Sequence, residues 1–124
     1  MPGFVRVTGA SELSFPSYDG NGMFRSLGNV LANPRVGLLF LDFEQPRRLR
    51  VLGRAAAAED DPLRAEFAGA QLVVRVRAEQ IFPNCPRYIH RMQLVETSVY
   101  APCPGHEPPQ PGWKQHFKEV LPKR

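Results

Sequence analysis

A short turn and the helix after it carry the residues best placed for chemistry. Residues 19–22 read Asp-Gly-Asn-Gly, which supplies glycines that adopt positive φ and side chains that bond their own backbone. A helix is predicted over Met23–Asn33, because apolar residues recur at the spacing of one helical face and Pro34 follows. Asp19 or Asn21 is expected to cap its N-terminus.

The start of this helix is typical of an anion site. The first amides of a helix lack backbone acceptors, and the helix dipole favours negative charge beside them. Arg25 and Ser26 add a guanidinium and a hydroxyl, with Asn21 just before them and Asn29 one turn later. The functional interpretation is a phosphate cradle. The alternative is an ordinary capped connection between a strand and a helix, because short glycine-containing motifs are weakly specific.

A second set of candidates lies on a long strand predicted over Arg47–Ala57. Side chains alternate along a strand, so Leu49, Val51 and Gly53 share one face, and the arginines at 48, 50 and 54 share the other with Leu52. In the functional interpretation, Arg48 and Arg50 reach the same ligand as the helix. In the alternative, this is a solvated outer face with carboxylates nearby.

These candidates are positioned by a chain made mostly of strands. Further strands are predicted at Phe4–Val7, Glu12–Phe15, Val36–Asp42, Gln71–Pro83 and Leu94–Tyr100. Short helices are predicted at Asp60–Phe67, Arg87–Met92 and Trp113–Val120. The apolar run Val36–Asp42 is expected to be buried on both faces. The pattern indicates a mainly β (α+β) fold, either a small antiparallel barrel or a sheet with peripheral helices.

Size and composition favour one small soluble domain. The 124 residues are expected to form a single domain over 1–124, with a proline-rich connector at 101–112. The net charge of +4 suits a phosphorylated ligand and does not demand nucleic acid. The N-terminus lacks the apolar run of a signal peptide, and no run of 18 apolar residues predicts a membrane span. With only two cysteines, a cytoplasmic protein with reduced thiols is expected.

Several blocks together resemble the pyridoxamine 5′-phosphate oxidase-like, FMN-binding split-barrel family. They are residues 19–29 (DGNGMFRSLGN), 33–40 (NPRVGLLF) and 46–54 (PRRLRVLGR). Residues 82–90 (FPNCPRYIH) and Trp113-Lys114 are similar to one branch of it. The resemblance implies a six-stranded antiparallel split barrel that binds FMN at a homodimer interface. It also implies a flavin-dependent oxidoreductase that acts on a small-molecule substrate.

The resemblance also suggests roles for individual residues. The family's Ser-Arg-Lys phosphate motif falls on Phe24, Arg25 and Ser26, so only the arginine is kept. Arg48 stands where the family has a glutamine near the flavin ring or ribityl chain. The expected cofactor-binding residues are Asn21, Arg25, Ser26, Asn29, Arg48 and Arg50. No catalytic residue is assigned, because hydride transfer to a flavin needs no side-chain base. Pyridoxal phosphate-binding residues are not matched, so that activity is not transferred.

Family members usually carry a further helix and one or two strands before the position of Pro2. A partner subunit is therefore expected to complete the barrel, or flavin binding is weakened. Weakened flavin binding would favour an alternative function. In this alternative, the protein is a non-catalytic member of the same fold that binds flavin, deazaflavin or haem, or that only dimerises.

Other combinations of residues give weaker hypotheses. The spacing of Cys85, His90, Cys103 and His106 matches no common zinc finger, so separate structural roles are expected and no metal site. Trp113 is expected to dock the last helix; the alternative is stacking on a partner's flavin. Single-stranded nucleic acid ranks low, because aromatics are not interleaved with the basic residues on the strand faces. Those residues are Arg48, Arg50, Arg54, Arg75 and Arg77.

Overall fold

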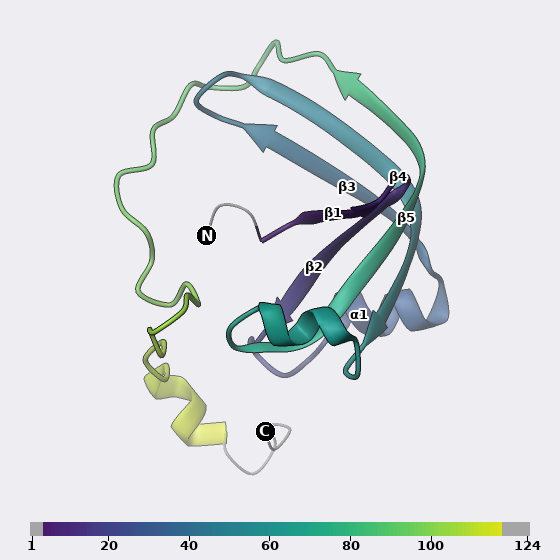
Figure 1. The fold of residues 1–124 in the computed structure, drawn as a ribbon. Coiled ribbons are helices and arrows are strands. Elements are labelled where there is room, and N and C mark those ends of the chain that lie inside the picture. The colour runs from purple at the N-terminus through teal and green to yellow at the C-terminus, as the bar shows by residue number, and fades with distance from the viewer. Residues whose placement is uncertain (1–3, 118–124) are drawn as a thin grey trace.

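Five antiparallel strands form one curved sheet in the order β1-β2-β5-β4-β3 (Figure 1). The computed structural model describes residues 4–117. The strands are β1 (Arg6–Gly9), β2 (Glu12–Tyr18), β3 (Arg35–Asp42), β4 (Arg47–Ala58) and β5 (Ala70–Asn84). The helices are α1 (Arg25–Ala32) and the 3-10 helices η1 (Pro62–Glu66) and η2 (Gly112–Phe117). The mainly β, antiparallel class with short peripheral helices is confirmed, with five strands in the described residues where the resemblance implies six.

One face of the sheet packs against α1. The centre of this core is Ala55, Val74 and Val76, and Ala55 lies directly opposite Val76 across the β4–β5 pair. Leu27 and Val30, one turn apart on α1, pack against the same cluster. Burial of these two side chains fixes the helix on the sheet and turns its other side to solvent.

The opposite face of β5 carries η1. Arg75 points away from the Val74 and Val76 side, because neighbouring side chains alternate along a strand. Its guanidinium bonds the Asp61 carboxylate at 2.5 and 3.0 Å and Glu12 at 2.8 Å. Asp61 also accepts from the Leu63 amide at 2.9 Å, so one carboxylate caps η1 and holds it to the strand.

A close approach in the middle of the sheet requires a glycine. The β4–β5 register shifts between Leu52 and Gly53, where β5 carries one extra residue. A Cβ at Gly53 would lie 2.1 Å from the Arg77 carbonyl oxygen. Any larger residue here would force the two strands apart.

The position of β3 differs from the sequence prediction. Val36–Asp42 is expected to be buried on both faces, but β3 is an edge strand and its residues alternate between exposed and half-buried. Leu39 is 47% exposed and Leu41 is 42% exposed. The apolar run therefore indicates a strand with one face on the core and one uncovered face.

The chain after β5 also departs from the prediction. Arg87–Met92 is not a helix and Leu94–Tyr100 is not a strand; β5 itself extends one residue beyond the predicted Gln71–Pro83 at each end. Neither segment pairs with the sheet, whose order ends at β1 and β3. The C-terminal helix, expected over 113–120, is the 3-10 helix η2, and residues 118–120 lie outside the described residues. No helix within residues 4–117 is long and apolar enough to span a membrane.

Candidate functional site

The entry turn (residues 19–24) leads from β2 into α1 and sets the geometry of the predicted cradle. Asn21 Oδ1 accepts from the Met23 amide at 3.1 Å, which closes a turn before the helix. Gly22 and Phe24 both have positive φ, at 73° and 46°. A left-handed phenylalanine is uncommon, so this entry is conformationally strained.

The helix begins at Arg25 and ends at Ala32, inside the predicted Met23–Asn33. Neither Asp19 nor Asn21 caps it, which corrects the prediction: the N-cap is Phe24, with no side-chain cap hydrogen bond. The first backbone bond runs from the Gly28 amide to Phe24 O at 2.7 Å. Within the described residues, the backbone amides of the first turn before Gly28 therefore donate no hydrogen bond.

The side chains of the cradle (Asn21, Arg25, Ser26 and Asn29) are all exposed. Arg25 and Asn29 lie one turn apart, on the side of α1 away from the sheet. Among residues 4–117, the Arg25 guanidinium has no acceptor and the Ser26 hydroxyl has no partner. An unpaired guanidinium and hydroxyl beside unused helix amides form a donor set that suits a phosphate.

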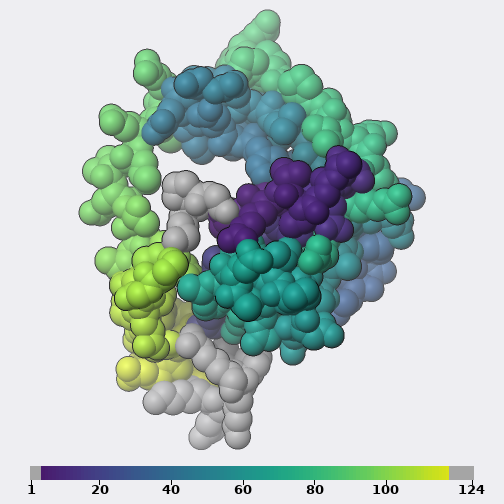
Figure 2. Space-filling view, in the orientation of Figure 1, coloured from purple at the N-terminus to yellow at the C-terminus, as the bar shows by residue number. Residues whose placement is uncertain are grey.

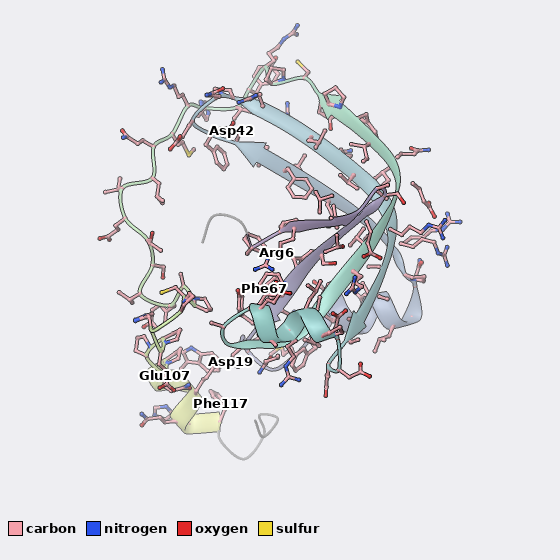
Figure 3. The ribbon with its side chains drawn as sticks, in the orientation of Figure 1. Arg6, Asp19, Asp42, Phe67, Glu107 and Phe117 are labelled. Atoms are coloured by element: carbon pink, nitrogen blue, oxygen red, sulfur yellow. The ribbon has the colours of Figure 1, made fainter. Side chains whose placement is uncertain are left out.

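The structure places Arg48 and Arg50 away from the cradle. Ala55 donates to the carbonyl of Pro34, just after α1, at 2.8 Å. Arg48 lies seven residues from Ala55 along β4, about 23 Å at the usual strand rise. Figure 3 labels one residue in each region. Asp42 is the register partner of Arg47, next to Arg48, and Asp19 lies in the entry turn before α1. Within one chain, the cradle and the two arginines therefore lie in separate regions of the structure.

The two arginines differ in their own surroundings. Arg48 is half-buried and donates from Nε to Cys85 O at 2.9 Å, with Nη2 on the same carbonyl. Arg50 is exposed and has no side-chain partner within the described residues. Both face the same side as Leu39 and Leu41, their register partners on β3. We call these four residues the β3–β4 patch.

A cavity lies beside each group of candidates. One of about 420 Å³ lies next to Arg48 and is also lined by Phe40, Leu49 and Asn84. The Asn84 Oδ1 atom is buried there without a hydrogen-bond partner. A larger cavity, of about 720 Å³, lies between the entry turn and the C-terminal segment (residues 100–117).

Sequence reasoning missed the contact that closes the larger cavity. Lys114 of η2 forms an ion pair with Asp19, 95 residues away in the chain. The Lys114 ammonium also lies 5.6 Å from the centroid of the Trp113 ring. No local pattern marks such a pair; the only available signal was the Trp-Lys dipeptide after the proline-rich connector. The contact supports the expectation that this end of the chain docks on the barrel.

The structure also places residues of the two weaker hypotheses, a metal site and nucleic-acid binding. No group of three potential metal-ligating side chains occurs in residues 4–117. His106 instead bonds Val99 O through Nε2 at 2.8 Å, and its amide bonds Cys103 O at 3.1 Å. Of the arginines considered for nucleic acid, Arg75 is bound to two carboxylates: Asp61, which caps η1, and Glu12 on β2.

Comparisons with known proteins agree with this fold. The family model for pyridoxamine 5′-phosphate oxidase matches residues 1–98. A structure of HupZ from Group A Streptococcus is similar with a TM-score of 0.52 and 17% identity, over 64% of this chain and 68% of that chain. A candidate pyridoxamine 5′-phosphate oxidase from Lactobacillus delbrueckii is similar with a TM-score of 0.51 and 25% identity, also over 64% and 68%. A search of curated proteins gave no match. The expected split-barrel fold is thus confirmed, and because the family model spans most of the sequence, the chain belongs to the pyridoxamine 5′-phosphate oxidase family.

Proposed function

We propose that the protein is an FMN-binding flavoprotein of this family, and an oxidoreductase acting on a small-molecule substrate. The observation that carries the proposal is the uncapped start of α1. Unused backbone amides, the Arg25 guanidinium and the Ser26 hydroxyl all lie there without a partner in the described residues. This donor set suits the dianionic phosphate of FMN, because both the helix dipole and the guanidinium favour negative charge.

Each cradle residue has a distinct proposed task. Arg25 binds the phosphate as a charged donor, and Ser26 adds a hydroxyl where the family motif has a lysine. Asn21 holds the entry turn through its bond to the Met23 amide. Asn29, exposed one turn after Arg25, would donate its side-chain amide to the ribityl chain. When bound, FMN supplies the electron chemistry, so the protein needs to bind, orient and shield it.

We also propose that the working unit is a homodimer. Within one chain, Arg48 and Arg50 lie in a different region from the cradle. A second copy would bring two arginines to the cradle if its β3–β4 patch faced it. The patch is suited to an interface, since Leu39 and Leu41 expose apolar surface on an edge strand. In a two-fold dimer, each cradle would receive the two arginines of the other subunit.

The arm (residues 85–99), which follows β5, supports the same assembly. It has no strand or helix. Its Met92 amide bonds Phe43 O in the β3–β4 turn at 2.9 Å, and Figure 2 shows a gap between a later part of the arm and the body of the sheet. Its apolar side chains are uncovered; Tyr88 is 86% exposed and Val95 is 96% exposed. Large exposed apolar side chains in a row are typical of a protein–protein contact.

The first test is an absorption and fluorescence spectrum of the purified protein, before and after denaturation. Release of a yellow fluorophore is expected. A haem absorption band would assign the alternative cofactor. A colourless protein that takes up no added FMN would contradict the proposal and favour the dimerising alternative.

The second test removes the cradle. The double variant Arg25→Ala/Ser26→Ala is expected to weaken FMN binding about 10- to 100-fold, since charge-assisted hydrogen bonds are worth about 1.5–3 kcal/mol. Titration of apoprotein with FMN, followed by flavin fluorescence, measures the Kd. Arg77→Ala/Ser11→Ala is a matched control, because both residues are exposed, Arg77 points to the face of β5 opposite the Val74 and Val76 side that packs against α1, and Ser11 lies in the turn between β1 and β2. An unchanged Kd in the first variant would rule out the cradle.

A further inference from the structure

The larger cavity, between the entry turn and the C-terminal segment, offers a second ligand site. We propose that it binds a small planar cation, held between aromatic walls and the carboxylates at its rim. The proposal does not rest on FMN binding, since Arg25, Ser26 and the two asparagines of the cradle do not line this cavity. Its volume of about 720 Å³ lies within the usual range for small-molecule sites, about 300–1,000 Å³.

Aromatic side chains come to this cavity from distant parts of the chain. The lining rings belong to Tyr18, Phe24, Tyr100 and Trp113. Aromatic faces attract cations, and they stack on planar rings. The strained, left-handed Phe24 is one of these walls, so the conformation of the entry turn contributes directly to the cavity.

An ammonium group already occupies part of this environment. Lys114 Nζ lies 5.6 Å from the Trp113 ring centroid and pairs with Asp19, and the Lys114 side chain is only 13% exposed. The cavity therefore accommodates a cation between an aromatic ring and a carboxylate. Lys114 also links the C-terminal segment to the entry turn, so it acts as a positioning residue that keeps the two sides of the cavity together.

The remaining charges favour a cation over an anion. Glu59 and Glu107 line the cavity, and their carboxylates have no partner within residues 4–117. Figure 3 labels Asp19 and Glu107, which come from the two sides of the cavity. The basic lining residues are Lys114, paired with Asp19, and Arg64, which donates to the Glu59 carbonyl at 2.8 Å. With three carboxylates and two basic groups, the lining has one net negative charge.

The test uses the protein as purified and its single tryptophan, which lines the cavity. Three quenchers share one ring shape: 1-methylnicotinamide (a cation), nicotinamide (neutral) and nicotinate (an anion). Quenching of Trp113 fluorescence is expected to saturate with the cation, at an apparent Kd at least about threefold below that of the neutral ring. N-acetyltryptophanamide corrects for collisional quenching. Linear, equal quenching by all three, or tighter binding of nicotinate, would overturn the proposal.

A variant without two of the lining carboxylates tests whether they select the cation. Glu59→Gln/Glu107→Gln is expected to raise the Kd of 1-methylnicotinamide about three- to tenfold and to leave that of nicotinamide unchanged. Glu44→Gln is the control, since Glu44 is an exposed carboxylate in the β3–β4 turn, outside the cavity. Equal Kd values in the double variant, the control and the unmodified protein would show that the carboxylates do not select a cation, and the proposal would fail. Lys114→Met is a second test. If the C-terminal segment closes the site, quenching of Trp113 fluorescence by 1-methylnicotinamide is expected not to saturate in this variant.

Discussion

At the scale of single residues, the role of an arginine depends on whether a carboxylate lies beside it. Arg75, on β5, and Arg50, on β4, both lie on strand faces that sequence alternation marks as polar. Arg75 binds Asp61 and Glu12, whereas Arg50 has no partner in the described residues. The difference arises from Asp61, the N-cap residue of η1, whose carboxylate binds Arg75 on β5. Only the fold decides which arginine stabilises the protein and which remains available for a ligand.

The Arg75 pairs predict a pH dependence of stability. The hydrogen bond from Arg75 lowers the pKa of Asp61 below its ordinary value of 3.8. The hydroxyl of Thr8, and then Arg75, lower the pKa of Glu12 below 4.5. A carboxylate whose pKa is lowered by folding stabilises the fold above its ordinary pKa, and the contribution is lost as the pH falls through the folded value. Stability from these pairs should therefore be full near neutral pH and decline below about pH 4.

Asp61→Asn tests this contribution. The Asp61 side chain is 6% exposed, so its loss leaves a poorly solvated Arg75 guanidinium. We expect Tm at pH 7 to fall by about 5–10 °C, and the difference from the unmodified protein to shrink towards pH 3. Thermal melts followed by circular dichroism across this pH range measure both effects. Asp60→Asn, at the exposed neighbouring carboxylate, is the control. A Tm difference that stays constant from pH 7 to pH 3 would contradict the linkage.

At the scale of elements, a glycine in the sheet and a glycine in α1 have opposite surroundings. Gly53 lies at the register shift between β4 and β5, where an added Cβ meets the Arg77 carbonyl at 2.1 Å. Gly28 lies in α1, where an added Cβ meets nothing within 4 Å. The same substitution should therefore destabilise one element and stabilise the other.

Gly53→Ala is expected to lower the free energy of unfolding by about 2 kcal/mol or more, because backbone has to move. Gly28→Ala is expected to raise it by about 0.5–1 kcal/mol, since alanine is the better helix former. Urea denaturation followed by far-UV circular dichroism gives both values. Should Gly53→Ala unfold at the same urea concentration as the unmodified protein, the close approach of β4 and β5 would be wrong.

The elements also show what could be predicted from the sequence. The strands up to Asn84 follow from apolar alternation and turn residues, which mark where each strand begins and ends. The burial predicted for both faces of Val36–Asp42 was wrong, because an apolar run does not reveal whether a strand lies at the edge of a sheet. The helix predicted at Arg87–Met92 and the strand predicted at Leu94–Tyr100 were wrong for a related reason: among the described residues, neither segment pairs with a strand of the sheet. The Met92 amide bonds Phe43 O at 2.9 Å, but Phe43 lies in the turn after β3. The start of α1 was placed within two residues, but its cap depends on the left-handed Phe24, which no composition rule predicts.

At the scale of the whole molecule, several exposed apolar side chains lie on the two segments where a partner is proposed. The β3–β4 patch exposes Leu39 and Leu41 beside two arginines, and the arm exposes Tyr88 and Val95. The two edge strands, β1 and β3, leave backbone donors and acceptors unpaired within the sheet. An assembly that covers this surface would also bring two arginines to the cradle, so dimerisation and cofactor binding should be coupled.

Leu39→Lys/Leu41→Lys tests this coupling. Two added charges per subunit would face each other across a two-fold interface, and we expect the dimer Kd to rise at least about 100-fold, as burial of unpaired charge is costly. Light scattering after size-exclusion chromatography measures the mass, and FMN titration of the same samples should show weaker binding as the monomer fraction grows. Val7→Lys is the control, because Val7 is 84% exposed on β1, at the other edge of the sheet. A double variant that remains dimeric would move the interface away from β3. A monomer that binds FMN with unchanged affinity would show instead that the cradle works without Arg48 and Arg50 of a second subunit.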